Sequence, residues 1–192
     1  MAVVVMHAVA SVDGFIADAN DDVGPLFDWY FNGDVDIVDG GPFKVSRASA
    51  DYVRPMWQSI ATTVIGRHLF DLTNGWEGRP PAGEHMVVVS HRARPDGWHP
   101  EASCYFIDDV AAAIAKAKEL AGPRVVAVAA GEVGGQALAL GLVDDVAMDV
   151  VPVVFGAGKR YFGRVDRQHL LAEPDVVIRG DRVLHLRFRV RR

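Results

Sequence analysis

The sequence predicts an α/β protein with a mixed, mostly parallel β-sheet flanked by helices and with antiparallel strands at its C-terminal end. Short apolar, β-branched runs alternate with segments of helical periodicity from the N-terminus to residue 140. Glycine or small polar residues end most of these runs, as at the carboxyl ends of buried parallel strands. From residue 146 onward the helical segments stop and a hairpin pattern follows, which indicates antiparallel pairing.

Length and composition indicate one globular domain over residues 1–192. A chain of 192 residues is long enough to bury a substantial core. Half of the residues are hydrophobic and 23% are charged, which is typical of globular rather than disordered chains. The net charge of −5 gives no electrostatic reason to expect nucleic acid or an anionic membrane as a partner. A local basic pocket for one phosphorylated ligand remains compatible with it.

The single cysteine, Cys104, excludes an intrachain disulfide, so a reducing compartment is expected. The apolar N-terminus lacks the basic residues of a signal peptide and runs directly into the polar segment 11–14. No apolar run approaches the ~20 residues that a membrane helix requires. We therefore expect a cytoplasmic protein without a membrane partner.

The first strand is predicted at residues 3–10, a β-branched run that suits a buried central position. Residues 18–49 are rich in Asp, Gly, Asn and Pro but contain an aromatic cluster, Phe27, Trp29, Tyr30 and Phe31. A long irregular segment is commonly a mobile linker or part of a binding wall, and the aromatic content favours the wall. A helix is predicted at 49–60, where Pro55 is unfavourable unless it lies in the first turn.

Four further buried strands alternate with helices in the middle of the chain. The strands are predicted at 62–65, 86–89, 103–107 and 125–129, and the helices at 67–72, 108–122 and 133–140. The helix at 108–122 has the clearest signals, because Asp108 or Asp109 can cap its start and Gly122 with Pro123 ends it.

The end of the chain predicts a long apolar strand at 146–155 and a hairpin of 170–178 with 183–190. Pro152 within the long strand indicates a bulge or an edge position. The last strand alternates strictly, and its polar side is expected to be a solvated face that protects the sheet edge. That side consists of His185, Arg187, Arg189 and Arg191.

Three predicted strand ends carry residues suited to phosphate. These are Gly66 with Arg67, Ser90 with His91 and Arg92, and the segment from Gly131 to Gly135. The carboxyl ends of parallel strands lie along one rim, where open α/β sheets bind ligands. The helix that opens at Gly131 offers free backbone amides to a pyrophosphate, and Arg67, Ser90 and Arg92 could hold the extra phosphate that distinguishes NADPH from NADH.

Each of these signals is weak alone, and their convergence carries the hypothesis. Three glycines at such a turn more often allow tight packing, and Gly131, Gly134 and Gly135 lack the usual dinucleotide-binding spacing.

The sequence signals for substrate-binding residues are weaker still. Asp13 is most simply part of an Asp-Gly turn, although its carboxylate could pair with a ring N–H or relay a proton. Asp28, beside Trp29, is a similar candidate next to an aromatic stacking wall.

Metal and nucleophile chemistry are not indicated. The seven histidines lack the spacing of a helical zinc site, and there is no second cysteine. Neither a Gly-x-Ser-x-Gly elbow nor a P-loop is present. Cys104 lies within a predicted strand and is expected to be a core thiol.

Taken in chain order, these segments resemble the dihydrofolate-reductase-like superfamily. Within it they are most similar to the reductase domain of the bifunctional riboflavin-biosynthesis deaminase-reductase and to its stand-alone bacterial relatives. The matching stretches are 10–17 (ASVDGFIA), 64–67 (VIGR), 87–90 (VVVS), 128–131 (VAAG), 142–145 (LVDD) and 151–158 (VPVVFGAG) followed by Tyr161 and Phe162.

The resemblance implies an eight-stranded mixed sheet with NADPH across the carboxyl ends of the strands. It places Gly66 and Arg67 near the adenosine phosphates, and Ser90 with His91 or Arg92 near the 2′-phosphate. The turn of Gly131, Glu132, Val133, Gly134 and Gly135 would lie near the pyrophosphate, and Ala10, Phe15 and Ile16 would border the nicotinamide. Asp13 would lie on the substrate side. Apart from the resemblance, Trp29 in the aromatic cluster and Phe155 are candidate substrate-binding residues. A homodimer through the C-terminal part of the sheet is also implied.

Departures from the family pattern shape the functional hypotheses. Glu132 and Val133 replace further glycine, Leu69 stands where dihydrofolate reductases tend to carry a threonine, and no helix carboxylate that would bind a pteridine is evident. The deaminase half is absent, and no basic pocket for a phosphoribosyl substrate is evident. The leading hypothesis is NADPH-dependent hydride transfer to a small heterocyclic substrate. The alternatives are a non-catalytic nucleotide-binding module, favoured by Glu132, and an interaction protein that uses the aromatic cluster.

Overall fold

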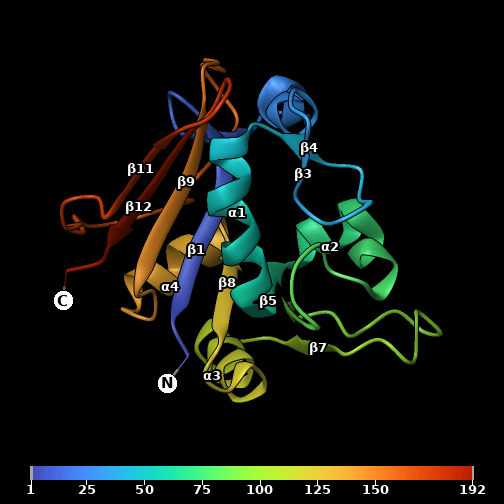
Figure 1. Ribbon diagram of the computed structural model, residues 1–192. Helices are drawn as coiled ribbons and strands as arrows, with labels where there is room; N and C mark the ends of the chain where they lie inside the picture. The colour runs from blue at the N-terminus through green and yellow to red at the C-terminus, as the bar shows by residue number, and fades with distance from the viewer. Residues whose placement is uncertain (1, 192) are drawn as a thin grey trace.

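The computed structural model describes residues 2–191 and places eight strands in one sheet (Figure 1). These strands are β1 (Val4–Ser11), β5 (Ile60–Gly66), β6 (His85–Val89), β7 (Cys104–Ile107), β8 (Val125–Ala129), β9 (Asp145–Val151), β11 (Val176–Arg179) and β12 (Leu184–Arg189). Their order is β11-β12-β9-β1-β8-β5-β6-β7. The strands from β9 to β7 are parallel, whereas β12 and β11 pair antiparallel at one side. The predicted fold class is therefore confirmed.

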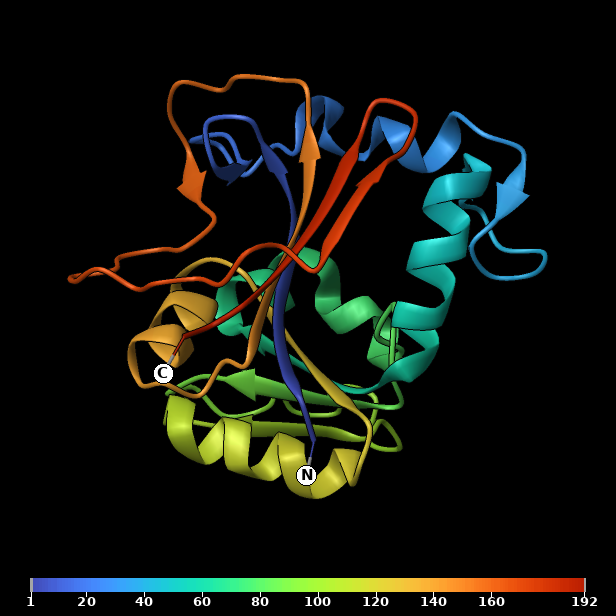
Figure 2. The same cartoon turned by 60° about the vertical axis from the view of Figure 1, so that its left-hand side comes forward.

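Helices cover both faces of the sheet (Figure 2). α3 (Val110–Ala121) and α4 (Glu132–Ala139) pack on one face, and α1 (Arg47–Ser59) and α2 (Arg67–Thr73) pack on the other. Neighbouring residues of β5 show the division, because Val64 joins the core under α3 whereas Ile65 contacts the cluster of Phe70 in α2. Within residues 2–191 no helix is long and apolar enough to span a membrane.

The irregular segment after β1 contains short elements that lie against the sheet. β2 (Phe15–Ala17) pairs with β10 (Lys159–Arg160), and β3 (Val35–Asp36) pairs with β4 (Lys44–Val45). The described part of the chain also contains two 3₁₀ helices, η1 (Gly24–Phe31) and η2 (Asn74–Gly78). In η1, Leu26, Trp29 and Tyr30 are buried and join the core under α1. Phe27 and Phe31 are exposed.

α1 continues through Pro55, which the sequence placed as an obstacle to a helix there. Ser46 caps the start, because its side chain accepts the backbone N–H of Ser49. Pro55 is exposed, so the backbone carbonyl that loses its helical partner can be solvated. The helix is also longer at its start than predicted.

Two predictions about the C-terminal strands were wrong. β9 ends at Val151, so Pro152 lies beyond the strand and produces neither a bulge nor an edge within it. β12 is not the edge strand, because β11 lies outside it. The side of β12 that carries His185 and Arg187 lies under α1, and His185 is fully buried instead of solvated. Only Arg189 and Arg191 of the predicted face are exposed.

Candidate functional site

The rim formed by the carboxyl ends of the parallel strands contains a point where the chain connections diverge. From β8 the chain passes through α4 and crosses β1 to reach β9, whereas from β5 it passes through α2 in the opposite direction to reach β6. In open α/β sheets such a divergence leaves a crevice at the strand ends, and ligands bind there. Here the connections diverge between the ends of β8 and β5.

The three predicted phosphate-type turns lie together at this rim. Gly66 ends β5, Ser90 follows β6 and Gly131 follows β8, and these three strands are neighbours in the order β8, β5, β6. A Cβ on Gly66 would lie 3.1 Å from Cγ2 of Val133, so the turns after β5 and β8 are in contact. A Cβ on Gly131 would lie 3.4 Å from Cδ1 of Ile16, which brings β2 to the same place.

Gly131 has a backbone conformation that only glycine adopts easily, with φ 99° and ψ −150°. Its N–H donates to the carbonyl of Tyr161 at 2.6 Å, and its own carbonyl accepts the N–H of Gly135 at 2.8 Å. The bond from Gly135 to Gly131 is the first hydrogen bond of α4. The backbone amides of residues 132–134 therefore have no partner within the helix and point outward from its start. These amides are the groups that could bind an anion.

Gly134 and Gly135 have a packing reason to be glycine. Both are buried, and a Cβ on Gly134 would lie 2.9 Å from Cε of Met6 in β1. A Cβ on Gly135 would lie 2.0 Å from the carbonyl oxygen of Phe162, so no side chain fits there. These two glycines allow α4 to approach the sheet closely, and their contact with a pyrophosphate remains a prediction. The carboxylate of Glu132 is exposed and lies 3.9 Å from Nε of Arg164.

Arg67 and Arg92 converge on Asp71 from the turns after β5 and β6. Nε of Arg67 lies 2.7 Å from Oδ1 of Asp71, and Nη2 of Arg92 lies 2.7 Å from Oδ2. The hydrogen bond from Arg67 is the largest cause that lowers the pKa of Asp71. Arg67 also donates to the carbonyl of Ala93 at 3.0 Å, and its guanidinium lies over the ring of Phe70 at 5.4 Å. It is therefore a fixed positive charge at the rim.

Ser90 forms a closed turn with Arg92 beside this pair of arginines. Its hydroxyl donates to the carbonyl of Arg92 at 2.7 Å and accepts the N–H of Arg92 at 2.9 Å. His91 is exposed in the same turn. The residues predicted to hold a 2′-phosphate thus lie in one loop next to Arg67.

The predicted nicotinamide residues lie on the β1 side of the point where the connections diverge. Ala10 is buried near the end of β1, and Phe15 and Ile16 lie in β2. Sequence reasoning missed Lys159 and Arg160, which form β10 beside β2, and the guanidinium of Arg160 lies 5.7 Å from the ring centre of Phe15. No local pattern indicates this pairing, because the two strands are far apart in the sequence.

Asp13 joins the loops that follow β1 and β9. Its carboxylate accepts the hydroxyl of Ser11 at 2.6 Å and the backbone amides of Phe155 and Gly156 at 3.2 and 2.7 Å. The hydrogen bond from Ser11 is the largest cause that lowers the pKa of Asp13, and the two amides lower it further. The structure therefore brings together Asp13 and Phe155, two residues predicted on the substrate side.

Trp29 does not form an accessible wall. Its side chain is 1% exposed and stacks on Tyr30 with ring centres 4.0 Å apart, because η1 turns these rings toward the core. The exposed rings of the segment are Phe27 and Phe31. Asp28 is exposed between them. The prediction that Trp29 stacks on a substrate is therefore corrected to a core position.

A buried polar network that the sequence did not reveal lies between α1 and the sheet. Asp149 is 2% exposed, and its two carboxylate oxygens lie 2.6 Å from Nδ1 of His185 and 2.9 Å from Nε2 of His7. Nε2 of His185 lies 2.9 Å from the hydroxyl of Ser49 in α1. Burial raises the pKa of Asp149, but the two histidines outweigh it and lower the pKa to about 2.

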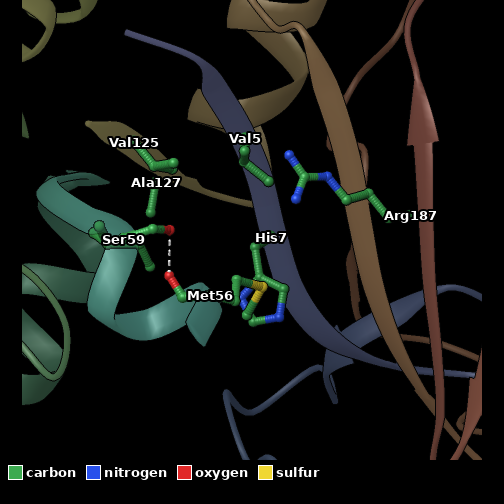
Figure 3. Close-up of a pocket in the computed structure, with 8 residues that line it drawn as sticks. Val5, His7, Met56, Ser59, Val125, Ala127 and Arg187 are labelled. Carbon is green, nitrogen blue, oxygen red and sulfur yellow. Dashed lines mark hydrogen bonds between the residues drawn. The ribbon is translucent and has the colours of Figure 1, made fainter. Parts of the chain in front are cut away.

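His7 also borders a small cavity beneath the end of α1 (Figure 3). The cavity has a volume of about 20 Å³, enough for one water molecule. Arg187 faces it from β12, while Met56 and Ser59 face it from α1. Because its other lining residues include Val5 and Val125, near the amino ends of their strands, this cavity is separate from the rim. Among residues 2–191 no cluster of three or more His, Cys, Asp or Glu side chains is arranged to hold a metal ion.

In sequence, no family model matches the chain, and no curated protein matches it. In structure it is similar to a protein ascribed to riboflavin biosynthesis from Shewanella sp. PV-4, with 19% identity, full coverage of both chains and a TM-score of 0.72. It is also similar to a pyrimidine reductase-like protein from Corynebacterium diphtheriae, with 14% identity, coverage of 100% of this chain and 92% of the other, and a TM-score of 0.61.

A third similar structure is a diaminohydroxyphosphoribosylaminopyrimidine deaminase/5-amino-6-(5-phosphoribosylamino)uracil reductase from Thermotoga maritima. The identity is 15%, the TM-score is 0.61, and the match covers 99% of this chain but 57% of the other. The chain thus spans little more than half the length of that bifunctional protein. Together these structures show that the chain has the fold of riboflavin-biosynthesis reductases, as the sequence resemblance implied.

Proposed function

We propose that this chain, which has the fold of the riboflavin-biosynthesis reductases, is an NADPH-dependent reductase that transfers hydride to a small heterocyclic substrate. One observation carries the proposal. The turns at Gly66, Ser90 and Gly131 follow three adjacent parallel strands at the point where the chain connections diverge. Three separate loops suited to phosphate at one such point of divergence favour a dinucleotide over a ligand with a single phosphate.

The residues at the rim fit the parts of an extended NADPH molecule. The amides at the start of α4, with Arg160 nearby, suit the pyrophosphate. The loop of Ser90 and Arg92, next to Arg67, suits the 2′-phosphate. Ala10, Phe15 and Ile16 would then border the nicotinamide, and Asp13 with Phe155 would border the substrate. The cofactor supplies the hydride, so the protein needs chiefly to align two rings and exclude water.

Titration with NADPH and NADH, followed by nicotinamide fluorescence, tests this proposal. We expect saturable binding of NADPH below millimolar concentration and weaker binding of NADH, because Arg67 and Arg92 have no 2′-phosphate to contact in NADH. If neither NADPH nor NADH bound, the reductase proposal would be wrong.

A non-catalytic nucleotide-binding module on the same fold is the second candidate. Its support is Glu132, a carboxylate in the first turn of the helix proposed to face the pyrophosphate. The ion pair with Arg164 weakens this support, because it offsets the negative charge. Tight NADPH binding without NADPH oxidation across a broad substrate panel would favour this candidate.

A homodimer through the C-terminal strands is part of the proposal. Val177 in β11 and Leu184 in β12 are exposed large apolar side chains, and Val177 pairs with Leu186 in the ladder. Their exposure suits a surface that a second copy covers. Light scattering at micromolar concentration would test it, with the mass of one chain as the contrary result.

A reducing compartment accords with the buried thiol of Cys104, because burial raises the pKa of this thiol to about 11.

A further inference from the structure

Asp71 lies between the two arginines proposed to bind the 2′-phosphate of NADPH. Each of its carboxylate oxygens contacts one arginine, because Oδ1 lies 2.7 Å from Nε of Arg67 and Oδ2 lies 2.7 Å from Nη2 of Arg92. A phosphate group likewise presents several oxygens to guanidinium groups and forms charge-assisted hydrogen bonds with them. The carboxylate of Asp71 therefore makes with these arginines the contacts that a phosphate would make.

The two arginines differ in how firmly the protein holds them. The side chain of Arg67 is 17% exposed, donates to the carbonyl of Ala93 at 3.0 Å, and lies over the ring of Phe70 at 5.4 Å. The side chain of Arg92 is 66% exposed, and among residues 2–191 its one ion pair is with Asp71. Arg67 therefore has a fixed position without Asp71, whereas Arg92 can move from Asp71 to a ligand.

The charges of this cluster favour an anion only weakly while Asp71 is ionised. The hydrogen bond from Arg67 is the largest cause that lowers the pKa of Asp71, so this carboxyl group is ionised at neutral pH. Two guanidinium groups and one carboxylate leave a single net positive charge for a phosphate monoester, which carries about −1.5 to −2 charges at pH 7. Arg94, in the same loop, donates to the carbonyl of Trp98 at 3.0 Å instead.

We infer that Asp71 determines nucleotide specificity, because its carboxylate competes with the 2′-phosphate of NADPH for Arg67 and Arg92. The inference rests on the proposed reductase function and names a residue that tunes the cofactor preference of that site. Binding of NADPH requires Arg92 to exchange one anionic partner for another, while Arg67 stays in place. NADH has no 2′-phosphate, so its binding leaves the contacts of Asp71 intact. Asp71 thus lowers the preference for NADPH below the value that two unpaired arginines would give.

Replacement of Asp71 by Asn has two opposite effects on NADPH binding. Removal of a unit charge roughly 5 Å from a phosphate in partly exposed surroundings strengthens binding by about tenfold. Loss of an exposed ion pair loosens Arg92, and such a pair changes an equilibrium constant by only about twofold. The amide oxygen of Asn can still accept one guanidinium N–H, which limits this loss. The charge effect is the larger one, so tighter NADPH binding is expected.

The test measures the dissociation constants of NADPH and NADH by nicotinamide fluorescence for the full chain and its variants. We expect Asp71→Asn to bind NADPH about fivefold more tightly and NADH with unchanged affinity. Asp71→Glu keeps the negative charge and should bind both nucleotides as the native chain does. Asp175→Asn is the matched control, because it removes an exposed carboxylate paired with Arg189 beside β11, at the other side of the sheet. It should change neither constant.

Two smaller nucleotides locate the effect. Adenosine 2′-monophosphate and adenosine 5′-monophosphate have the same charge and differ in the position of the phosphate, and each is used to displace bound NADPH. Asp71→Asn should strengthen displacement by the 2′-isomer about fivefold and change displacement by the 5′-isomer little. An equal gain for both isomers would show a general increase of positive charge at the rim, and the inference would then be wrong.

Asp71 is 41% exposed in α2, so Asn fits there without loss of packing, and circular dichroism verifies the fold of the variant. Unchanged or weaker NADPH binding by folded Asp71→Asn, when the native chain binds NADPH, would overturn the inference and leave the proposed function standing. Absence of NADPH binding by the native chain would instead overturn the proposed function together with the inference that rests on it.

Discussion

The carboxylate of Asp149 and the imidazole of His185 lie 2.6 Å apart across the β9–β12 ladder, and both side chains are almost completely buried. His7 holds the other carboxylate oxygen, and Ser49 connects His185 to α1. The ring of Trp29 in η1 packs edge-on against His185 with centres 5.2 Å apart. This network therefore joins α1 and η1 to the sheet.

Replacement of Asp149 should destabilise the protein strongly. Asp149→Asn removes the charge that both histidines contact, and we expect a loss of about 3 kcal/mol in the free energy of unfolding. Asp175→Asn is the matched control, because Asp175 forms an exposed pair with Arg189 and should cost less than about 1 kcal/mol. Urea unfolding followed by circular dichroism measures both, and similar losses for the two variants would contradict the assignment.

Stability should fall in acid through the same carboxylate. Its pKa is about 2 in the folded protein against an ordinary value of 3.8, so the folded state binds the proton less readily than the unfolded state. The stabilisation, about 2 kcal/mol, is complete above the unfolded pKa and is lost as pH falls toward 2. Unfolding midpoints between pH 5 and pH 2 should decline more steeply for the native chain than for Asp149→Asn. Parallel declines would refute this account.

Arg92 should discriminate between the two nicotinamide nucleotides. It is exposed next to Ser90 and Arg67, so Arg92→Ala should weaken NADPH binding about tenfold and change NADH binding little. Arg79→Ala, an exposed position outside the rim loops, serves as the control. Fluorescence titration with both nucleotides gives the result, and an equal loss for NADPH and NADH would place Arg92 away from the 2′-phosphate.

Gly131 should tolerate alanine less well than other glycines with positive φ. Gly131→Ala forces a side chain into φ 99°, ψ −150°, at an expected cost of about 2 kcal/mol and with loss of NADPH binding. Gly97 has φ 70° and open space where a Cβ would lie, so Gly97→Ala should cost about 1 kcal/mol and leave binding intact. Thermal unfolding and NADPH titration of the two variants separate backbone strain from a role at the rim. Normal NADPH binding by Gly131→Ala would exclude this turn from the site.

The sheet was predictable because its buried strands are continuous apolar runs with clear ends, as at Gly66 and Gly131. The buried network was not predictable. The network forms because the register of β9 and β12 places His185 opposite Asp149. It also requires α1 to cover the side of β12 that carries His185, which the alternating sequence pattern indicates as solvent-exposed. The direction of Trp29 was missed for a similar reason, since a short 3₁₀ helix lacks the periodicity that separates inward from outward rings.

The pairing of β10 with β2 illustrates a further limit. Lys159 lies opposite Ala17, although the two residues are more than a hundred positions apart in the sequence. β2 has three residues and β10 has two, so neither strand is long enough to show a hydrophobic pattern. Short strands of this kind are defined by tertiary contacts rather than by local preference. Arg160 could therefore be assigned to the candidate site only from the structure.

The bonds from Asp13 to the amides of Phe155 and Gly156 have a consequence for synthesis on the ribosome. They connect positions 142 and 143 residues apart, and among residues 2–191 β1 pairs only with β8 and β9. A nascent chain must therefore hold its first strand with both edges open until residue 125 and beyond have emerged. Chains that stop before β9 would lack both the centre of the sheet and the wall at its rim, so they should accumulate as chaperone-bound or aggregated fragments rather than as a smaller folded protein.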